Sequence, residues 1–336
     1  CPLAFPLLSL FPPAAMRGAR SALLTLPALV VASESWPDLP GLINSADEAS
    51  YLSVLGPALA AIKLSYTATY GSYRRPWAVN ASLPGGWQRF PHLDADPPNG
   101  GFHGLVFFHA ASRRSILALR GTDLNASGAS GLADECADRL LWENATWESL
   151  PAECLRFPHS VLDYLSSAAA FADRALEALP TATKPLFVGH SLGAGLAVLL
   201  AANRSHEDRW QPRVLGLSVP PYDTALRARV GREPRELDQQ RLAVVYNIFD
   251  PLYHEGNLTG GNAGAAICTY APPEPAACAR CYSPGAKEDS PDCKECFAQT
   301  HVLKNYIDDL NGTMQKHPRF RPRCLGMPSP RDILLV

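Results

Sequence analysis

An apolar run enters a Gly-x-Ser-x-Gly turn at Leu186-Phe187-Val188-Gly189-His190-Ser191-Leu192-Gly193-Ala194-Gly195. A β run, this turn and a following helix of small residues are together the sequence form of a nucleophile elbow. The turn is so tight that a Cβ at Gly189 or Gly193 would clash with the neighbouring strand or helix. The pattern predicts that the Ser191 hydroxyl is a nucleophile, held at a helix N-terminus above the carboxyl edge of a parallel sheet. The motif alone also occurs by chance, and its two flanks are what favour the elbow.

A serine nucleophile needs a general base, and the base needs a carboxylate that orients it. In α/β-hydrolases the order along the chain is Ser, then Asp or Glu, then His. Asp250 ends an apolar strand candidate that begins at Leu242, and His301 follows further on. We therefore expect Ser191, Asp250 and His301 to form a catalytic triad. A simple strand-end turn with Pro251 is the alternative role of Asp250.

Other histidines compete with His301 or need a different role. His254 and His317 are the alternatives for the general base; His317 lies among Lys and Arg residues that suggest a solvated tail. We expect the ring of His190 to point into the sheet–helix packing as a hydrogen-bonded core histidine. His159 is expected to have a structural role as a buttress of the elbow.

An oxyanion that forms during acyl transfer needs two preorganised N–H donors. The first expected donor is the backbone N–H of Leu192, which directly follows the nucleophile. The second is expected from the loop after an earlier strand. Arg120-Gly121-Thr122 follows such a strand candidate, and Thr122 adds a hydroxyl donor.

Strand candidates alternate with helical patterns along the chain. The expected strands are Gly104 to Ala110, Ser115 to Leu119, Pro185 to Val188, Arg213 to Val219 and Leu242 to Phe249. The expected helices are Ala46 to Tyr70, Pro158 to Leu179, Leu192 to Asn203 and His301 to Leu310. This alternation predicts an α/β sheet of mostly parallel strands flanked by helices, and together with the elbow it indicates an α/β-hydrolase fold. Residues 35–336 are predicted to form one domain, with a Cys-rich insertion at 257–297 that is interpreted as a disulfide-held loop.

The first residues have the features of a targeting segment. A basic stretch from Met16 to Arg20 precedes an apolar stretch from Ala22 to Ala32, with small residues for cleavage and no acid. We interpret residues 1–34 as this segment, with a signal peptide that starts at Met16 and with residues 1–15 as upstream translation. A plastid-type transit peptide is the alternative. The apolar stretch is too short to span a bilayer comfortably.

Glycosylation and cysteine patterns favour the secretory route. Six Asn-x-Ser/Thr sequons contain more than half of the chain's asparagines, and they begin at Asn80, Asn125, Asn144, Asn203, Asn257 and Asn311. Setting Cys1 aside, the eight remaining cysteines are an even number, which in an oxidising compartment are expected to pair. We therefore expect a secreted glycoprotein.

The cysteines form two groups. Cys136 and Cys154 flank one loop and are candidates for a bridge. The other six cluster near the C-terminus, at Cys268, Cys278, Cys281, Cys293, Cys296 and Cys324. The two Cys-x-x-Cys pairs among them also have zinc-ribbon spacing, so a structural zinc site is the alternative to disulfides.

The charge balance limits the partners. The formal net charge is −2, and no basic stripe is present. This argues against a nucleic acid partner. The chemistry expected at Ser191 needs no cofactor. Oligomeric state is left open.

These motifs together resemble the class 3, fungal-type triacylglycerol lipase family, over about Ala46 to Leu325. The matching segments are Arg120-Gly121-Thr122, Pro158 to Leu162, Gly189 to Ala194, Leu217-Ser218-Val219-Pro220 and Asn247 to His254. The resemblance implies that Thr122 is the oxyanion-hole residue and that the triad is Ser191, Asp250 and His301. It also implies an acylglycerol or another lipid ester as substrate. A phospholipase A1 or a feruloyl-type esterase would use the same parts, and a non-catalytic lipid-binding glycoprotein is the alternative from another class.

The chain departs from the family pattern in places. The Phe-Gly-x-Pro strand end of the family is weakened here to Leu217-Ser218-Val219-Pro220. Lys304 stands where the family places an aromatic residue after its histidine, and Tyr306 comes later. A lid is expected at Cys136 to Trp142, where Leu and Trp side chains would face a lipid interface when it opens. The alternative is that these side chains are core in a disulfide-closed loop.

Overall fold

The computed structural model describes residues 36–124, 128–180, 183–204, 211–254, 262, 264–287, 289–311 and 320–324. All of them belong to the compact unit Ser33–Val336. The predicted targeting segment at residues 1–34 lies outside the described residues, as does His317. Among the helices within the described ranges, none combines the length and apolar character needed to span a bilayer.

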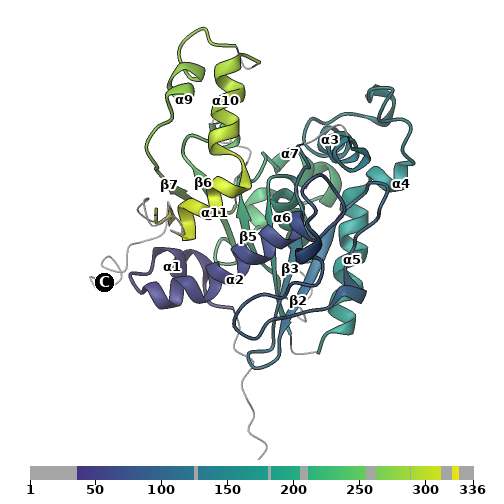
Figure 1. Cartoon of the computed structure of the whole chain (residues 1–336), viewed down its shortest axis with the longest axis vertical. Helices are drawn as coiled ribbons and strands as arrows, with labels where there is room; N and C mark the ends of the chain where they lie inside the picture. Colours follow the sequence, from purple (N-terminus) through teal and green to yellow (C-terminus); the bar gives the residue numbers. More distant parts are fainter. Residues whose placement is uncertain are drawn as a thin grey trace, which may run out of the picture. The chain divides into compact units, whose positions relative to one another are not determined.

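A central sheet organises the described residues, and its eight strands follow one another in chain order (Figure 1). They are β1 Gln88–Arg89, β2 Gly104–His109, β3 Arg114–Leu119, β4 Lys184–His190, β5 Arg213–Leu217, β6 Leu242–Asn247, β7 Ala266–Tyr270 and β8 Arg323–Cys324. The strands from β3 to β7 are parallel to one another. β1, β2 and β3 pair antiparallel, and β8 returns antiparallel to β7. This mostly parallel sheet, flanked by helices, confirms the predicted α/β-hydrolase fold.

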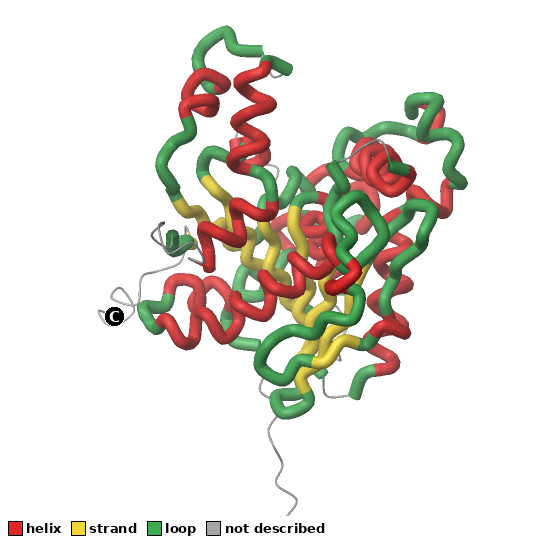
Figure 2. The backbone as a smooth tube through the Cα atoms, in the orientation of Figure 1, coloured by secondary structure: helices red, strands yellow, loops and turns green. Residues whose placement is uncertain are grey.

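Helices cover both faces of the sheet (Figure 2). On one face lie α1 Leu39–Asn44, α2 Glu48–Thr67 and α11 Leu303–Asn311, and on the other α5 Tyr164–Ala178 and α6 Leu192–Asn203. The remaining helices and helical turns are η1 Pro76–Ala78, η2 Pro91–Leu93, α3 Ala129–Leu141, η3 Trp147–Ser149, α4 His159–Leu162, α7 Asp223–Ala225, η4 Leu226–Val230, η5 Pro234–Glu236, α9 Ala276–Cys281 and α10 Pro291–Thr300.

Successive strand residues alternate between the two cores, as the twofold repeat of a strand requires. In β2, Val106 belongs to one core while its neighbours Leu105 and Phe107 belong to the other. Each large side chain buried in this way stabilises the fold by about 1.5–3 kcal/mol. The sheet is therefore a rigid platform, and residues at the carboxyl ends of its parallel strands are held in place.

The two long helices expected before the elbow are present with shifted ends. α2 begins after Asp47, whose side chain accepts hydrogen bonds from backbone N–H groups of the first turn, and it continues through Pro57. The helix expected from Pro158 to Leu179 is divided at Asp163 into α4 and α5. The Asp163 side chain caps α5 by accepting from the backbone N–H of Ser166, which is the usual way to satisfy a free helix N-terminus.

The interpretation of residues 257–297 as a loop is wrong in part. This insertion contains β7, which pairs in parallel with β6 inside the sheet, and the short helices α9 and α10. A five-residue strand and helices of six and ten residues are too short to show a clear period. The backbone hydrogen bonds of β7 are also made with a partner strand, so local sequence carries little sign of them.

Four disulfides bridge the described residues. Cys136–Cys154 joins α3 to the loop before α4, as predicted. Cys268–Cys324 joins β7 to β8, and Cys278–Cys296 and Cys281–Cys293 clamp α9 to α10. The cysteines with zinc-ribbon spacing are thus paired with one another. Within the described ranges, no group of three His, Cys, Asp or Glu side chains could hold a metal ion.

Candidate active site

The predicted nucleophile elbow is a turn between β4 and α6. Ser191 follows the last residue of β4 and has φ 55° and ψ −130°, a left-handed backbone conformation that is strained for a residue with a side chain. A Cβ on Gly189 would meet the Gly193 backbone, and a Cβ on Gly193 would meet the Leu119 carbonyl. Both glycines are therefore needed for the close approach of strand and helix, as expected from the sequence.

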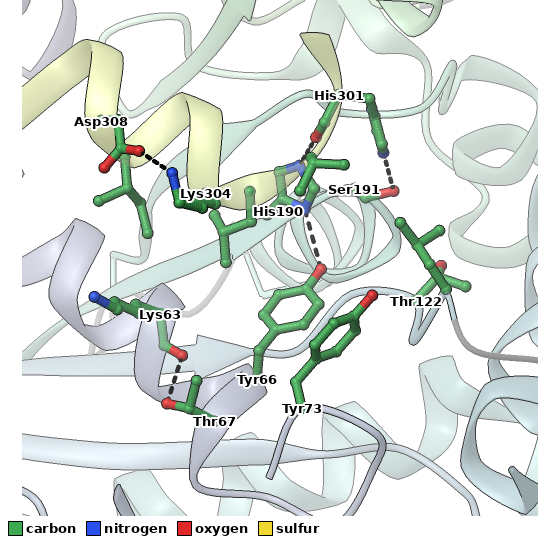
Figure 3. A pocket seen from close by; sticks show the side chains of 14 residues that line it. Lys63, Tyr66, Thr67, Tyr73, Thr122, His190, Ser191, His301, Lys304 and Asp308 are labelled. Carbon is green, nitrogen blue, oxygen red and sulfur yellow. Dashed lines mark hydrogen bonds and ion pairs between the residues drawn. The ribbon is translucent and has the colours of Figure 1, made fainter. Parts of the chain in front are cut away.

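The structure brings Ser191, Asp250 and His301 together. Figure 3 shows the contact between Ser191 and His301. His301 Nε2 lies 3.1 Å from Ser191 Oγ. His301 Nδ1 lies 3.2 Å from Oδ1 and 3.1 Å from Oδ2 of Asp250. A carboxylate only accepts hydrogen bonds, so it fixes the proton on Nδ1 and leaves Nε2 free to accept the serine proton.

The Cys-rich insertion positions the histidine of this set. His301 caps the C-terminus of α10, and its backbone N–H donates to the Phe297 carbonyl over 2.8 Å. The ring of Phe297 stacks on the His301 ring, with centroids 4.2 Å apart. Because two disulfides clamp α10 to α9, the insertion is a rigid support for the imidazole.

Two hydroxyl groups next to Asp250 were not predicted from the sequence. Tyr306 Oη donates to Asp250 Oδ2 over 2.8 Å and accepts from the Asn247 backbone N–H. Ser218 Oγ donates to the same oxygen over 2.6 Å and lies 2.8 Å from His301 Nδ1. Both residues stood at departures from the family pattern. These departures marked the two positions as unusual, but the sequence did not indicate that the two hydroxyls contact one carboxylate.

These contacts set the charge of Asp250, which is fully buried. Burial raises the pKa of its carboxyl group, but the His301 imidazole and the hydrogen bonds from Ser218 and Tyr306 outweigh that effect. The pKa of Asp250 is consequently below its ordinary value. The group is therefore a carboxylate at neutral pH, as an orienting acceptor for His301 must be.

The backbone of Ser218 permits a test of its hydroxyl. Ser218 has φ 50° and is fully buried, so it holds a strained conformation that glycine would adopt freely. We expect Ser218→Gly and Ser218→Ala each to lower kcat for ester hydrolysis about tenfold, because both lose a hydrogen bond to a buried charge. Ser218→Gly should unfold at a higher temperature than Ser218→Ala, since it relieves about 1 kcal/mol of backbone strain. Wild-type kcat in Ser218→Gly would show that the hydroxyl has no part in orienting Asp250.

His190 is the hydrogen-bonded core histidine that the sequence predicts. Its Nε2 donates to the His301 carbonyl over 2.7 Å, so its Nδ1 accepts from the Tyr66 hydroxyl at 3.0 Å. Burial, assisted by the nearby His301, lowers the pKa of His190 to about 3. A neutral His190 therefore connects the turn at Ser191 to the backbone of His301.

The other histidines lie elsewhere. His254 is half-buried and its ring lies tilted against that of Tyr282, with centroids 4.0 Å apart. Within the described part of the chain, it is His301 that contacts Ser191. The expectation that His159 buttresses the elbow is wrong, because its side chain is exposed and its ring lies tilted against Trp147, with centroids 5.1 Å apart. It begins the short helix α4, at the far end of the loop closed by the first disulfide.

The expected oxyanion donors lie beside Ser191. Leu192 is the first residue of α6, and the first N–H groups of a helix have no partner within it. Thr122 follows β3 and lines the same pocket as Ser191. Its hydroxyl donates to Asp138 Oδ2 over 2.7 Å, and the indole N–H of Trp142 donates to the other oxygen over 2.9 Å. Asp138 therefore holds the side chain of Thr122 in one orientation.

Asp138 should make stability depend on pH. Burial of its carboxyl group raises the pKa of Asp138 from 3.8 to about 7, although the residue as a whole is only half-buried. Between these values the folded state binds a proton that the unfolded state has lost, so the free energy of unfolding falls as pH rises through this window. We expect Asp138→Asn to remove this pH dependence. The free energy of unfolding of the variant, relative to that of wild type, should therefore rise by on the order of 2 kcal/mol from about pH 4 to about pH 8. Denaturant unfolding at both pH values measures it, and a constant difference between the two proteins would contradict it.

The predicted lid residues are packed in this structure. Leu140 and Leu141 of α3 are buried, and Trp142 is half-buried against the elbow helix. Cys136, in the same helix, is bridged to Cys154. The structure thus matches the alternative of core residues in a disulfide-closed segment, because Cys136, Leu140 and Leu141 are all buried.

A cavity of about 330 Å³ opens at Ser191 and His301. Its walls come from the C-terminal half of α2, the segment after β3 and the start of α11, and they include Tyr66, Leu303 and Ile307. Lys63 lines the cavity too, as does Lys304, which is paired with Asp308 at 2.6 Å (Figure 3). The cavity is mainly apolar in character with the polar reacting groups at one side, which suits an ester that carries a hydrocarbon chain.

Comparisons with known proteins give distant similarities to solved structures. The Lip2 lipase from Yarrowia lipolytica is 17% identical with a TM-score of 0.39, over 66% of this chain and 79% of that chain. Lipase II from Rhizopus niveus is 14% identical with a TM-score of 0.43, over 78% and 94%. A lipase from Rhizopus microsporus var. chinensis is 12% identical with a TM-score of 0.42, over 81% and 93%. No protein-family model and no curated protein matches the sequence.

Proposed function

We propose that this chain is a serine hydrolase of carboxylic esters and that its substrate is an acylglycerol. The single observation that carries the proposal is the position of His301, with Nε2 3.1 Å from Ser191 Oγ and Nδ1 against the buried Asp250 carboxylate. This arrangement activates a hydroxyl that is otherwise a poor nucleophile. The strained elbow supports the same role, because strain in an otherwise regular fold concentrates at functional sites.

The proposed reaction proceeds through an acyl-enzyme. His301 Nε2 takes the Ser191 proton while Oγ attacks the ester carbonyl carbon, and the carbonyl oxygen becomes negative. The backbone N–H groups of Leu192 and Thr122 stabilise that oxygen. The carbon–oxygen bond to the alcohol then breaks, and His301 returns the proton to the departing alcohol. Water, deprotonated by His301, attacks the acyl-enzyme, and Ser191 leaves with its proton restored.

The lining of the cavity supports a lipid ester as substrate. Apolar residues of α11 and an aromatic residue of α2 can accept an acyl chain beside the nucleophile. Lys63 on the same wall favours a phospholipid as the second candidate, since an ammonium group can pair with a phosphate. A phospholipase A1 would use the same Ser191 chemistry.

We also propose that the protein follows the secretory route. Four disulfides, with every cysteine of the described residues paired, support an oxidising compartment. The sequon residues Asn80 and Asn144 are exposed, as glycan acceptors must be. We propose that the apolar stretch near the N-terminus is the signal peptide that directs the protein to this route.

A serine-directed probe tests the function. A fluorophosphonate should label the purified protein at Ser191, as read by peptide mass spectrometry, because only an activated serine reacts with it. The labelled and unlabelled proteins are then assayed on triacylglycerols, phospholipids and short aryl esters. Labelling with turnover of acylglycerols supports a lipase, and faster turnover of phospholipids supports the second candidate. Absence of labelling in a folded protein would indicate a non-catalytic lipid-binding protein.

A further inference from the structure

A segment beside the pocket exposes aromatic rings together with arginines. Residues 70–77 read Tyr-Gly-Ser-Tyr-Arg-Arg-Pro-Trp. The exposed fraction is 38% for Tyr70, 40% for Tyr73 and 65% for Trp77. These are three of the six large hydrophobic side chains that are exposed among the described residues. Scattered single exposures need no explanation, but a cluster of this kind marks an interaction site.

Residues 70–77 are hydrogen-bonded to the residues after β3, next to Thr122, the proposed oxyanion residue. The backbone N–H of Ser72 donates to Asp123 Oδ2 over 2.7 Å. The Arg120 guanidinium, at the end of β3, donates to the Tyr70 carbonyl. The exposed rings are therefore held in a defined position relative to Thr122.

The same segment borders the pocket. Tyr73 lines the cavity with Ser191, and Figure 3 shows it on the side that also carries Tyr66 and Thr122. Leu124, which is 49% exposed, lines the cavity as well. A partner surface that contacted Tyr73 and Leu124 would therefore lie at the mouth of the pocket.

The charged side chains that residues 49–93 themselves contribute are basic, whereas Asp96 and Asp123 accept backbone hydrogen bonds from Tyr70 and Ser72. From Ala49 to Leu93 the chain contains no Asp or Glu but four cations, Lys63, Arg74, Arg75 and Arg89. The Arg74 guanidinium stacks over the ring of Tyr70 at 3.8 Å, and the Arg75 side chain is exposed. Amphipathic rings settle at the level of lipid headgroups, and arginines next to them are attracted to anionic headgroups.

We propose that residues 70–77 form a docking site for a lipid–water interface with anionic headgroups. The rings of Tyr73 and Trp77 enter the headgroup layer, while Arg74 and Arg75 pair with headgroup phosphates. The placement of that interface at a substrate entrance rests on the proposed function, whereas the docking itself does not. The expected lid in α3 offers no such surface in this structure, because its leucines are buried.

Binding to vesicles tests the proposal without any turnover. The parent protein carries Ser191→Ala, so that lipid is not consumed, and Asn80→Gln, so that no glycan stands beside Trp77. Flotation measures how much of this protein binds to two kinds of vesicle. The anionic vesicles contain phosphatidylcholine with phosphatidylglycerol, and the neutral vesicles contain phosphatidylcholine alone. The test variant is Trp77→Ala with Arg75→Gln. The matched control is Leu155→Ala with Arg156→Gln, an exposed apolar and basic pair in the loop before α4.

We expect the parent to bind the anionic vesicles at least fivefold more tightly than the neutral ones. The test variant should lose about tenfold or more on anionic vesicles, and the control pair less than twofold. Equal binding by test variant and parent, or an equal loss in the control pair, would overturn the proposal. Both outcomes are independent of the proposed function, which fails instead if the protein with Ser191 intact hydrolyses no ester, including monomeric short-chain esters that need no interface.

Discussion

Replacing Ser191 with alanine is expected to lower kcat/KM about 100,000-fold for every ester that the wild-type protein hydrolyses. The reason is that the substitution removes the only hydroxyl that His301 Nε2 contacts, at 3.1 Å, among the described residues. The oxyanion donors of the backbone stay in place, so slow residual hydrolysis above the rate in water is expected. Initial rates on an acylglycerol emulsion and on a soluble aryl ester measure both parts of this prediction.

The variant should remain folded. Alanine keeps the backbone geometry of the elbow and removes a single oxygen, so the free energy of unfolding should change by less than about 1 kcal/mol. Ser65→Ala is a matched control: its hydroxyl is also buried and bonds only to the Ile62 carbonyl within α2. The control should retain wild-type turnover. Turnover by Ser191→Ala within tenfold of wild type would require a different nucleophile and would refute the triad.

Replacing Asp250 with asparagine is expected to lower kcat by about 1,000- to 10,000-fold. An amide cannot accept hydrogen bonds at its nitrogen, yet Ser218, Tyr306 and His301 all donate toward this side chain. The amide N–H₂ would favour the His301 tautomer with the proton on Nε2, which cannot take the Ser191 proton. The buried donors left unpaired should also cost about 1–3 kcal/mol of stability.

A second carboxylate at the cavity, Asp308, serves as a control. It shows whether a loss of rate in Asp250→Asn comes from the proposed triad role or from the loss of any negative charge near the cavity. Asp308→Asn removes an acid that lines the same cavity but pairs with Lys304 away from the nucleophile. We expect its kcat to stay within about threefold of wild type, since a partly exposed ion pair contributes little. If Asp250→Asn behaved like Asp308→Asn, the carboxylate of Asp250 would have no special role, and the base would have to be oriented by Ser218 alone. Thermal unfolding of both variants shows whether any loss of rate comes from loss of structure.

Local patterns predicted the elements around the elbow well and failed elsewhere for identifiable reasons. The run before Ser191 and the small residues after it specify a strand, a turn and a helix within one continuous segment, and the structure has them there. β7 was missed because a strand of only five residues depends on β6 for its hydrogen bonds. His159 was misplaced: it follows the disulfide-closed loop that ends at Cys154, and its side chain is exposed.

The glycines around Ser191 could be recognised in the chain because the tight turn depends on neighbouring backbone geometry. Asp250 and His301 were expected from the residue order of α/β-hydrolases and not from local geometry. Which cysteines pair, whether the leucines of α3 are exposed, and which hydroxyls meet Asp250 depend on segments far apart in sequence. Ser218 and Tyr306 come from two different elements and converge on one oxygen. Residues 70–77 come to the pocket mouth through bonds to Arg120 and Asp123. Such contacts are specified by the packing of the whole sheet and its helices, and no local period or spacing encodes them.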